Sequence, residues 1–263
     1  GSQKKIFRIH SKDTSYLLIC FPHVGRQNYS YQAYKNIYSL LQSSSITVPK
    51  CLYELKQDYS LILEDCGDTH LWDILQATPP NTDPFSYFKQ ATNTIKDMLS
   101  IATSGSWTQS KFSSQVLFQE LEFFVSEHIQ ANSKYQQATW WQKDRFFDEA
   151  QRLCDSIAKT SKYFVHRDFH SKNLMYKDNK LFVIDFQDAR LGPASYDIVS
   201  LCFDPYLQLK PDQYKNLFNQ SLKHLSNQIS SVILDEITSC WQEVLLQRLL
   251  KVIGSYSYLS RTK

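Results

Sequence analysis

The sequence predicts an α+β protein with two lobes, a small β-rich N-terminal lobe over residues 1–66 and a large, mostly helical C-terminal lobe over residues 67–263. β-Rich runs are concentrated before residue 66, whereas apolar residues recur at helical spacing through most of the remainder. The length of 263 residues is also sufficient for two lobes that share a cleft.

The smaller lobe is expected to be a sheet with one helix. Two β-rich runs, Ile6 to His10 and Tyr16 to Phe21, are separated by a polar turn. From Tyr29 to Leu41, apolar and aromatic residues recur with helical spacing, which predicts the helix. Cys51 to Leu55 and Tyr59 to Leu63 then predict a hairpin.

The larger lobe is expected to be built from helices. Thr82-Asp83-Pro84 combines a capping side chain with a proline in the first turn, and predicts the start of a helix that runs to Ala102. Apolar stripes predict further helices from Leu117 to His128 and from Phe146 to Ile157. Val232 to Leu259 predicts one long amphipathic helix or two shorter ones.

The composition excludes several classes of protein. A net charge of +3 is far too small for a nucleic-acid-binding surface, and no apolar run approaches the length that spans a bilayer. The 6 glycines are well separated, so the usual dinucleotide and P-loop phosphate motifs are absent. No signal peptide is visible, and the 6 scattered cysteines predict free thiols in a reducing compartment. We expect a cytoplasmic monomer that binds neither nucleic acid nor a membrane.

A second predicted hairpin lies in the larger lobe. Two apolar runs flank Asp178-Asn179, a dipeptide typical of a two-residue hairpin turn. Pairing Lys177 with Lys180 sets Asn173 opposite Ile184.

Oxygen-bearing side chains converge at the open end of this hairpin. Asp185 follows the second strand directly, so its side chain is expected to meet that of Asn173. Asp168 lies just upstream, on the loop that enters the first strand. Carboxylate and amide oxygens are the ligands that a divalent cation such as Mg²⁺ prefers.

The residues around this cluster match a known pattern. His166-Arg167-Asp168, four further residues and Asn173 reproduce the protein-kinase catalytic loop H-R-D-x-x-x-x-N. Asp185-Phe186 stands where the first two residues of D-F-G would be, with Gln187 in place of the glycine. In that pattern the first Asp accepts the substrate hydroxyl proton, while the Asn and second Asp hold magnesium against the nucleotide phosphates.

Longer segments resemble one superfamily. HRDFHSKNLM and VIDFQDARLGPASYDIVSL are similar to the aminoglycoside phosphotransferase and choline kinase superfamily, which has a two-lobed protein-kinase-like fold. Together with LLQRLLKVIGSYSYL, they resemble the bacterial anomeric kinases of cell-wall amino sugars. Those enzymes phosphorylate the C1 hydroxyl of N-acetylmuramate or N-acetylglucosamine. The resemblance therefore implies ATP and Mg²⁺ as cofactors, a small-molecule sugar as substrate and a place in peptidoglycan recycling.

The resemblance also implies roles for individual residues. Asp168 would be the catalytic base, Asn173 and Asp185 the magnesium ligands, and Asp197 a structural brace of the catalytic loop. The hinge that contacts adenine would consist of Glu64, Asp65 and Cys66.

Two further candidates lie inside the catalytic loop. His170 occupies the position of a protein-kinase catalytic lysine, so we count it as a candidate for contact with the transferring phosphate. For His166, a hydrogen bond to the backbone is the alternative to a catalytic role. Lys172 either contacts the nucleotide or faces solvent.

The smaller lobe lacks the strand lysine of protein kinases. The corresponding run, Tyr16 to Phe21, contains no lysine, a gap that the amino-sugar kinases share. Lys4, Lys5 or Arg8 would then reach the phosphates, unless they are plain surface charges. The chain also opens within what resembles the family's phosphate loop, so the strand that precedes this loop is expected to be missing.

The acceptor is expected to be small. The stretch after Asp185 leaves no room for the long activation segment on which protein kinases dock peptides. Candidate substrate contacts are Glu120, Gln187 and Asp188, with a surface helix residue as the alternative for Glu120. Three tryptophans are candidate pocket walls or core residues, namely Trp140, Trp141 and Trp241. A choline- or aminoglycoside-type kinase and a nucleotide-binding pseudokinase remain the alternative functions.

Overall fold

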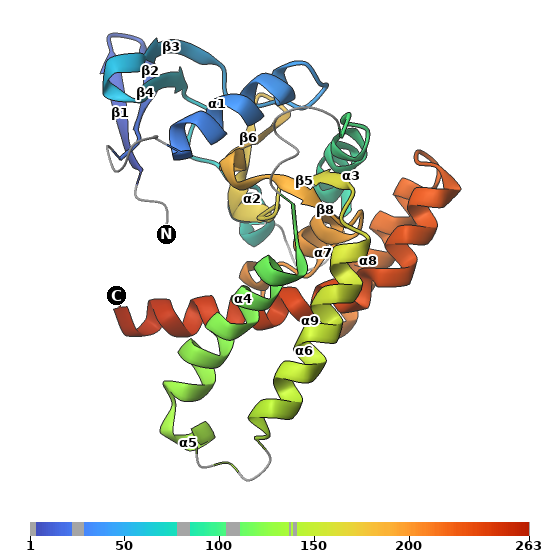
Figure 1. The fold of residues 1–263 in the computed structure, drawn as a ribbon. Helices are drawn as coiled ribbons and strands as arrows, with labels where there is room; N and C mark the ends of the chain where they lie inside the picture. Colours follow the sequence, from blue (N-terminus) through green and yellow to red (C-terminus); the bar gives the residue numbers. More distant parts are fainter. Residues whose placement is uncertain are drawn as a thin grey trace.

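The computed structural model describes residues 4–22, 29–77, 85–103, 111–136, 138 and 141–262. At one end of the molecule lies a four-stranded antiparallel sheet in the order β1-β2-β4-β3 (Figure 1). Its strands are β1 (Lys5–Ser11), β2 (Thr14–Cys20), β3 (Cys51–Leu55) and β4 (Ser60–Glu64). Helix α1 (Tyr29–Gln42) packs beside the sheet. The strands and helix predicted for this lobe are confirmed, with ends that differ by at most two residues.

Burial of its apolar face in the core stabilises helix α1. Tyr34, Ile37 and Leu41 recur with helical spacing and are all buried, so this stripe faces the core. The ring of Tyr34 packs against Phe186, which follows the hairpin of the larger lobe, at 4.7 Å between ring centroids. The helix therefore also connects the sheet to the segment that carries Asp185.

The rest of the molecule is mostly helical, as predicted. The helices are α2 (Leu71–Ala77), α3 (Phe85–Leu99), α4 (Ser114–Phe124), α5 (Ser133–Gln136), α6 (Lys143–Lys159), α7 (Tyr196–Cys202), α8 (Pro211–Ser226) and α9 (Ser231–Thr262). A π-helical turn, Val125–Gln130, continues α4. The C-terminal tail is one 32-residue helix rather than two, and it crosses beside α4 (Figure 1).

Helix α7 had no counterpart in the sequence analysis. Every residue from Tyr196 to Cys202 is buried, so the segment has no polar face and no amphipathic stripe. Helices α2 and α8 were also not predicted.

Two short ribbons complete the larger lobe. Strand β5 (Tyr163–Val165) pairs with β8 (Arg190–Gly192), and β6 (Leu174–Lys177) pairs with β7 (Lys180–Val183). The β6–β7 pair has the predicted register, with Lys177 opposite Lys180. The expected turn and pairing are therefore confirmed.

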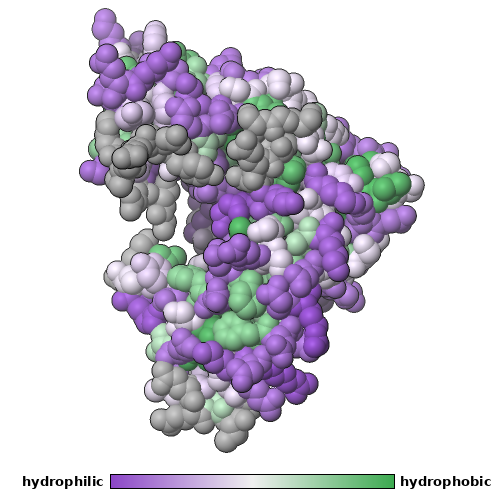
Figure 2. Space-filling model, viewed as in Figure 1, coloured by the Kyte–Doolittle hydropathy of each residue, from purple (hydrophilic) through white to green (hydrophobic). Residues whose placement is uncertain are grey.

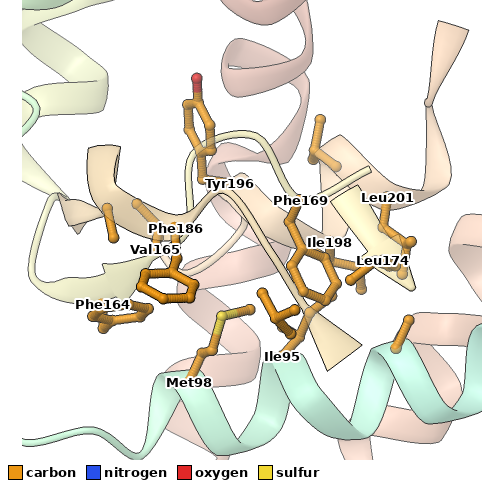
Figure 3. Packing of buried hydrophobic residues seen from close by; sticks show 14 of the residues in the cluster. Ile95, Met98, Phe164, Val165, Phe169, Leu174, Phe186, Tyr196, Ile198 and Leu201 are labelled. Atoms are coloured by element: carbon orange, nitrogen blue, oxygen red, sulfur yellow. The ribbon is translucent and has the colours of Figure 1, made fainter. Parts of the chain in front are cut away.

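The core holds the loop between these ribbons in place. Phe169 is fully buried, and Figure 3 shows it beside Ile198 and Leu174 above the helix that carries Ile95. A buried aromatic ring fixes the adjacent backbone, because removing it from the core would cost several kcal/mol, about 3–5 by analogy with Phe-to-Ala substitutions.

The structure also bears on the state of the cysteines and on the length of the helices. All 6 cysteines are free thiols, as predicted. Within the described segments, the helices are either too short or too polar to cross a bilayer.

Candidate active site

Asp197 holds the loop that precedes Asp168. Its buried carboxylate accepts hydrogen bonds from the backbone N–H groups of His166, at 2.7 Å, and Arg167, at 3.1 Å. Burial raises the pKa of Asp197 to about 6, while the nearby His166 acts in the opposite direction. The expected bracing contact between Asp197 and the catalytic loop is thus present.

Arg167 has an unusual backbone conformation that this bracing sustains. Its φ of 80° lies in the left-handed region, which costs a non-glycine residue about 1–3 kcal/mol. The backbone oxygen of Arg167 accepts a hydrogen bond from Arg248 at 2.7 Å. Its guanidinium donates to Glu120, also at 2.7 Å. The sharp turn is therefore held from both sides, and it determines where the next residue, Asp168, lies.

Asp168 carries a part-exposed, ionised carboxylate. Its side chain is 40% exposed, and Oδ1 lies 3.4 Å from Nζ of Lys251. Burial favours the neutral acid, but the positive charges of Lys251 and Arg248 lower the pKa of Asp168 below its ordinary value. A carboxylate that is charged at neutral pH and open to solvent can accept a proton from a bound hydroxyl group.

Asn173 lies at the entrance to β6, next to Asp168 in space. Its amide nitrogen donates to the backbone oxygen of Asp168 at 2.9 Å, so Oδ1 is the atom of this amide that can accept or bind a cation. Ile184 donates its N–H to the backbone oxygen of Asn173 at 3.1 Å, so the predicted pairing reaches the open end of the hairpin.

Asp185 follows Ile184 with a left-handed backbone, at φ 63°. Its carboxylate forms an ion pair with Lys4 and accepts a hydrogen bond from Gln187 at 3.1 Å. Burial acts to raise the pKa of Asp185, but the ammonium of Lys4 and the donor on Gln187 lower it overall. Asp185 is therefore a carboxylate that already binds one cation, at the same hairpin end as Asn173.

The donor set at the hairpin end is suited to magnesium. Among the residues that the structure describes, His, Cys, Asp and Glu side chains nowhere form a group of three or more that could enclose a metal ion. Mg²⁺ does not need such a cage, because it is usually bound through one or two carboxylates together with waters and substrate phosphates. The oxygens of Asp185 and Asn173 fit that mode.

Arg8 is paired with acidic residues of the segment after β4, and its contact with the phosphates stays a prediction. Its guanidinium forms a two-bond contact with Asp65, at 2.7 and 3.1 Å, and also pairs with Asp68 at 2.7 Å. In the sheet β2 lies between β1 and β4, with Arg8 opposite Leu17 and Leu17 opposite Leu63, so the side chain of Arg8 reaches past β2 to the segment after β4. Arg8 thus stabilises the segment after β4, whereas Lys5 is exposed on β1.

The predicted hinge connects the sheet to the second hairpin. Glu64 accepts a hydrogen bond from the backbone N–H of Lys50 at 3.2 Å. Cys66 is buried in a small apolar cluster with Met175 and Phe182, and this burial raises the pKa of its thiol to about 12. The thiol is therefore uncharged at neutral pH and packs among apolar side chains, while the contact of this segment with adenine stays a prediction.

Lys172 packs against two aromatic rings, and its contact with the nucleotide stays a prediction. Its ammonium lies 4.2 Å from the ring centre of Tyr206 and 4.6 Å from that of Trp72. Such cation–π contacts stabilise by about 0.5–2 kcal/mol. Lys172 therefore joins α2 to the turn around Tyr206.

His170 lies closer to the predicted base. Its ring packs edge-on against Tyr206, with 5.2 Å between ring centres, and its Nε2 is 3.4 Å from the amide nitrogen of Asn173. Burial lowers the pKa of His170, so the imidazole is neutral at neutral pH. It remains a candidate hydrogen-bond donor or acceptor for a phosphate.

Glu120 is largely buried, unlike the surface helix residue considered as its alternative. Its side chain is only 12% exposed, and its oxygens accept from Arg167 at 2.7 Å and from Gln247 at 2.8 Å. Nζ of Lys251 lies 3.6 Å away. Burial acts to raise the pKa of Glu120, yet the two cations lower it overall. Glu120 is therefore paired with cations near Asp168, and its contact with a substrate stays a prediction.

The other substrate candidates are more accessible. Asp188 is 55% exposed, 3.9 Å from Nη1 of Arg167, and accepts from Gln187 at 3.4 Å. Trp241 packs against Phe218 in the core, with 4.7 Å between ring centres, which agrees with the structural alternative. Trp140 lies outside the described residues.

Three residues of α9 were not recognised as part of the site. They are Gln247, Arg248 and Lys251, each in contact with Glu120 or with the Arg167–Asp168 loop. Their spacing within LLQRLLKVIGSYSYL was an available signal, because polar residues that recur one and four positions apart in a leucine-rich helix share a face.

The surface of the molecule is hollowed on one side. Figure 2 shows a recess between the lobe that carries the sheet and the lobe that carries α4 and α9. Asp168 follows β5 and Asp185 follows the β6–β7 ribbon, and Figure 1 shows β5 and β6 between the four-stranded sheet and helix α9.

Comparisons with known proteins agree with this arrangement. A family model described as a phosphotransferase enzyme family matches residues 2–225. An N-acetylmuramate/N-acetylglucosamine kinase of Pseudomonas aeruginosa is 25% identical over 215 residues, which cover 79% of this chain and 58% of that protein. A kinase of the same name from Neisseria meningitidis is 24% identical over 221 residues, covering 81% of this chain and 64% of the relative. The chain thus spans less than two thirds of the length of these relatives.

Solved structures share the fold at low identity. An ethanolamine kinase of Plasmodium vivax matches with a TM-score of 0.63 and 15% identity, over 94% of this chain and 72% of that one. A choline kinase of Streptococcus pneumoniae matches with a TM-score of 0.58 and 14% identity, over 97% and 87%. An ADP-bound aminoglycoside phosphotransferase matches with a TM-score of 0.54 and 17% identity, over 98% and 87%. The predicted two-lobed, protein-kinase-like fold is confirmed.

Proposed function

This chain belongs to the phosphotransferase enzyme family, and we propose that it is an ATP- and Mg²⁺-dependent kinase that phosphorylates a sugar hydroxyl. The acceptor we propose is the C1 hydroxyl of N-acetylmuramate or N-acetylglucosamine, in cytoplasmic peptidoglycan recycling. Residues 1–66 would bind the nucleotide, and residues 67–263 would supply the catalytic loop and the acceptor site.

One observation carries this proposal. An ionised, 40% exposed carboxylate, Asp168, lies beside the hairpin end that carries the oxygen donors of Asn173 and Asp185. Phosphoryl transfer needs a group that orients the attacking hydroxyl and, next to it, ligands for the metal that accompanies the phosphates. The loop and the hairpin supply both from one short stretch of chain.

The proposed step follows from these positions. Asp168 accepts the hydrogen of the acceptor hydroxyl, whose oxygen forms a bond to the γ-phosphorus as the bond from that phosphorus to the β-bridging oxygen breaks. The products are a sugar phosphate and ADP. Asn173 and Asp185 would hold the magnesium ion that neutralises charge on the phosphates. Lys4, next to Asp185 and Gln187, is placed to contribute a further positive charge.

The choice of acceptor rests on the curated relatives. Two of them, from Pseudomonas aeruginosa and Neisseria meningitidis, are named as N-acetylmuramate/N-acetylglucosamine kinases. The ethanolamine, choline and aminoglycoside kinases share the fold at 14–17% identity, which makes them comparisons for the assay rather than a guide to substrate.

A phosphoryl-transfer panel tests the proposal. The chain is incubated with Mg·ATP and, separately, with N-acetylmuramate, N-acetylglucosamine, choline or kanamycin, and ADP release is followed. We expect turnover with an amino sugar, phosphate on O1 of the product by ³¹P NMR, and a loss of about 10²–10⁴ in kcat for Asp168→Asn. Turnover with choline or kanamycin alone would contradict the proposed acceptor. Nucleotide binding without transfer to any of the four would instead indicate a pseudokinase.

A further inference from the structure

Lys251 lies in the last helix of the chain, 83 residues from Asp168, yet its ammonium is 3.4 Å from Oδ1 of that carboxylate. We propose that Lys251 is a positioning residue, which holds Oδ1 of Asp168 so that Oδ2 faces the acceptor hydroxyl. Lys251 would thus act on the reaction through Asp168. This inference rests on the proposed function.

Lys251 differs from the other cations around Asp168. Arg167 donates to Glu120, and Arg248 donates to the backbone oxygen of Arg167 and lies 4.8 Å from the ring centre of Tyr196. Both arginines therefore have other partners. In the part of the chain that the structure describes, Lys251 is the cation that forms an ion pair with the Asp168 carboxylate.

The Lys251 side chain is itself oriented. It is 16% exposed, and Glu120 lies 3.6 Å from its Nζ, on the face of α4 that meets α9. Burial acts to lower the pKa of Lys251, but Tyr196, Glu120 and Asp168 raise it overall. The group that faces Asp168 is therefore a charged ammonium between two carboxylates, which limits its freedom to move.

The ion pair with Lys251 restrains a side chain that the catalytic loop does not itself hold in place. The Asp168 carboxylate is 40% exposed. Asp197 holds the loop through the backbone N–H groups of His166 and Arg167, so it does not fix the side chain of Asp168. Without a side-chain partner, the carboxylate could rotate about χ1 and χ2. A misplacement of about 1 Å costs about 10²-fold in rate, which is the size of effect that a positioning contact can prevent.

A double-mutant cycle separates positioning from a structural role. We expect Lys251→Met to lower kcat by about 10²-fold, with an unchanged shift of the thermal midpoint on adding Mg·ADP. Because Lys251 acts through Asp168, adding Lys251→Met to Asp168→Asn should lower kcat by no more than about threefold further. Lys251→Arg, which keeps the charge, should retain kcat within about tenfold. Lys215→Met, on an exposed face of α8, is the matched control.

The kcat values of these variants decide whether Lys251 acts through Asp168. Unchanged kcat in Lys251→Met, or losses that multiply in the double variant, would overturn the positioning role. If Lys251→Met shows no cooperative thermal transition, Lys251→Gln takes its place with the same expectations. A wild-type chain that phosphorylates none of the acceptors would overturn the proposed function and the inference together, whereas an active wild type with a fully active Lys251→Met overturns the inference alone.

Discussion

The guanidinium of Arg248 donates a hydrogen bond at 2.7 Å to the backbone oxygen of Arg167, the residue whose left-handed φ of 80° directs the chain into Asp168. Helix α9 and the catalytic loop are thus joined at the most strained point of that loop. A backbone conformation of this kind persists only where the surroundings hold it.

Arg248→Met should therefore reduce both stability and activity. The substitution leaves the Arg167 carbonyl without its donor, and an unpaired buried carbonyl costs about 1–3 kcal/mol. The thermal midpoint should fall by about 2–4 °C for each kcal/mol, and kcat should fall with it as the turn relaxes. Scanning calorimetry and the transfer assay measure the two effects. Arg261→Met, also on α9 but in an exposed ion pair with Glu127, should change neither by a comparable amount.

Asp185→Asn should weaken the binding of Mg·ADP while leaving the stability of the free chain nearly unchanged. Asp185 is 40% exposed, so the free chain should unfold within a few degrees of the wild-type midpoint. Loss of one carboxylate ligand should, however, remove most of the stabilisation that Mg·ADP gives, since a ligand stabilises by about 2.7 kcal/mol at a hundred times its Kd. EDTA should abolish the same shift in the wild type. An Asp185→Asn variant with the full wild-type shift would contradict the assignment of Asp185 as a ligand.

Gly254→Ala should be destabilising even though alanine favours a helix. A Cβ atom at Gly254 would lie 2.8 Å from the Cα of Phe124, so α9 and α4 would have to separate. Overpacking of this kind costs about 1–3 kcal/mol, more than the roughly 1 kcal/mol that alanine gains over glycine in a helix. We expect a lower thermal midpoint by calorimetry. Ser239→Ala, exposed on the same helix, should leave the midpoint unchanged or slightly raised.

The Arg8–Asp65 pair predicts a specific dependence of stability on pH. Burial acts to raise the pKa of Asp65, but hydrogen bonds from Ser15, Gly67 and Arg8 lower it overall. A lowered folded-state pKa stabilises the folded protein above the unfolded pKa, about 3.9, and this stabilisation is lost as the pH falls through the folded value. The difference in free energy of unfolding between wild type and Asp65→Asn should therefore be largest near neutral pH and should shrink below about pH 4.

Urea titrations at several pH values measure that difference. Asp235→Asn, at an exposed position of α9, serves as the control and should show no such trend. A constant difference between wild type and Asp65→Asn from neutral to acidic pH would contradict the role of the Asp65 charge.

Local features of the site were accessible from the sequence. The turn at Asp178-Asn179 and the register of β6 with β7 depend on a dipeptide and on residues within one hairpin, so counting along the chain was sufficient. The order of Asp168, Asn173 and Asp185 is likewise contained in one short segment.

The partners of charged side chains were not accessible in this way. The sequence suggested direct ligand contacts for three such side chains, Arg8, Lys172 and Glu120. In the structure each of them contacts residues far away in the chain. A long, flexible side chain reaches many positions, and which of them it occupies depends on how whole helices and strands pack.

The sequence by itself therefore determined the two-lobed fold, the hairpin and the set of oxygen donors beside it, because these depend on local periodicity and turn chemistry. Only the tertiary structure decided that α9 supplies Arg248 and Lys251 to the loop around Asp168 and that Glu120 lies between Lys251 and Arg167. Those contacts depend on how closely α9 approaches α4, and that approach depends on the packing of side chains from both helices at once.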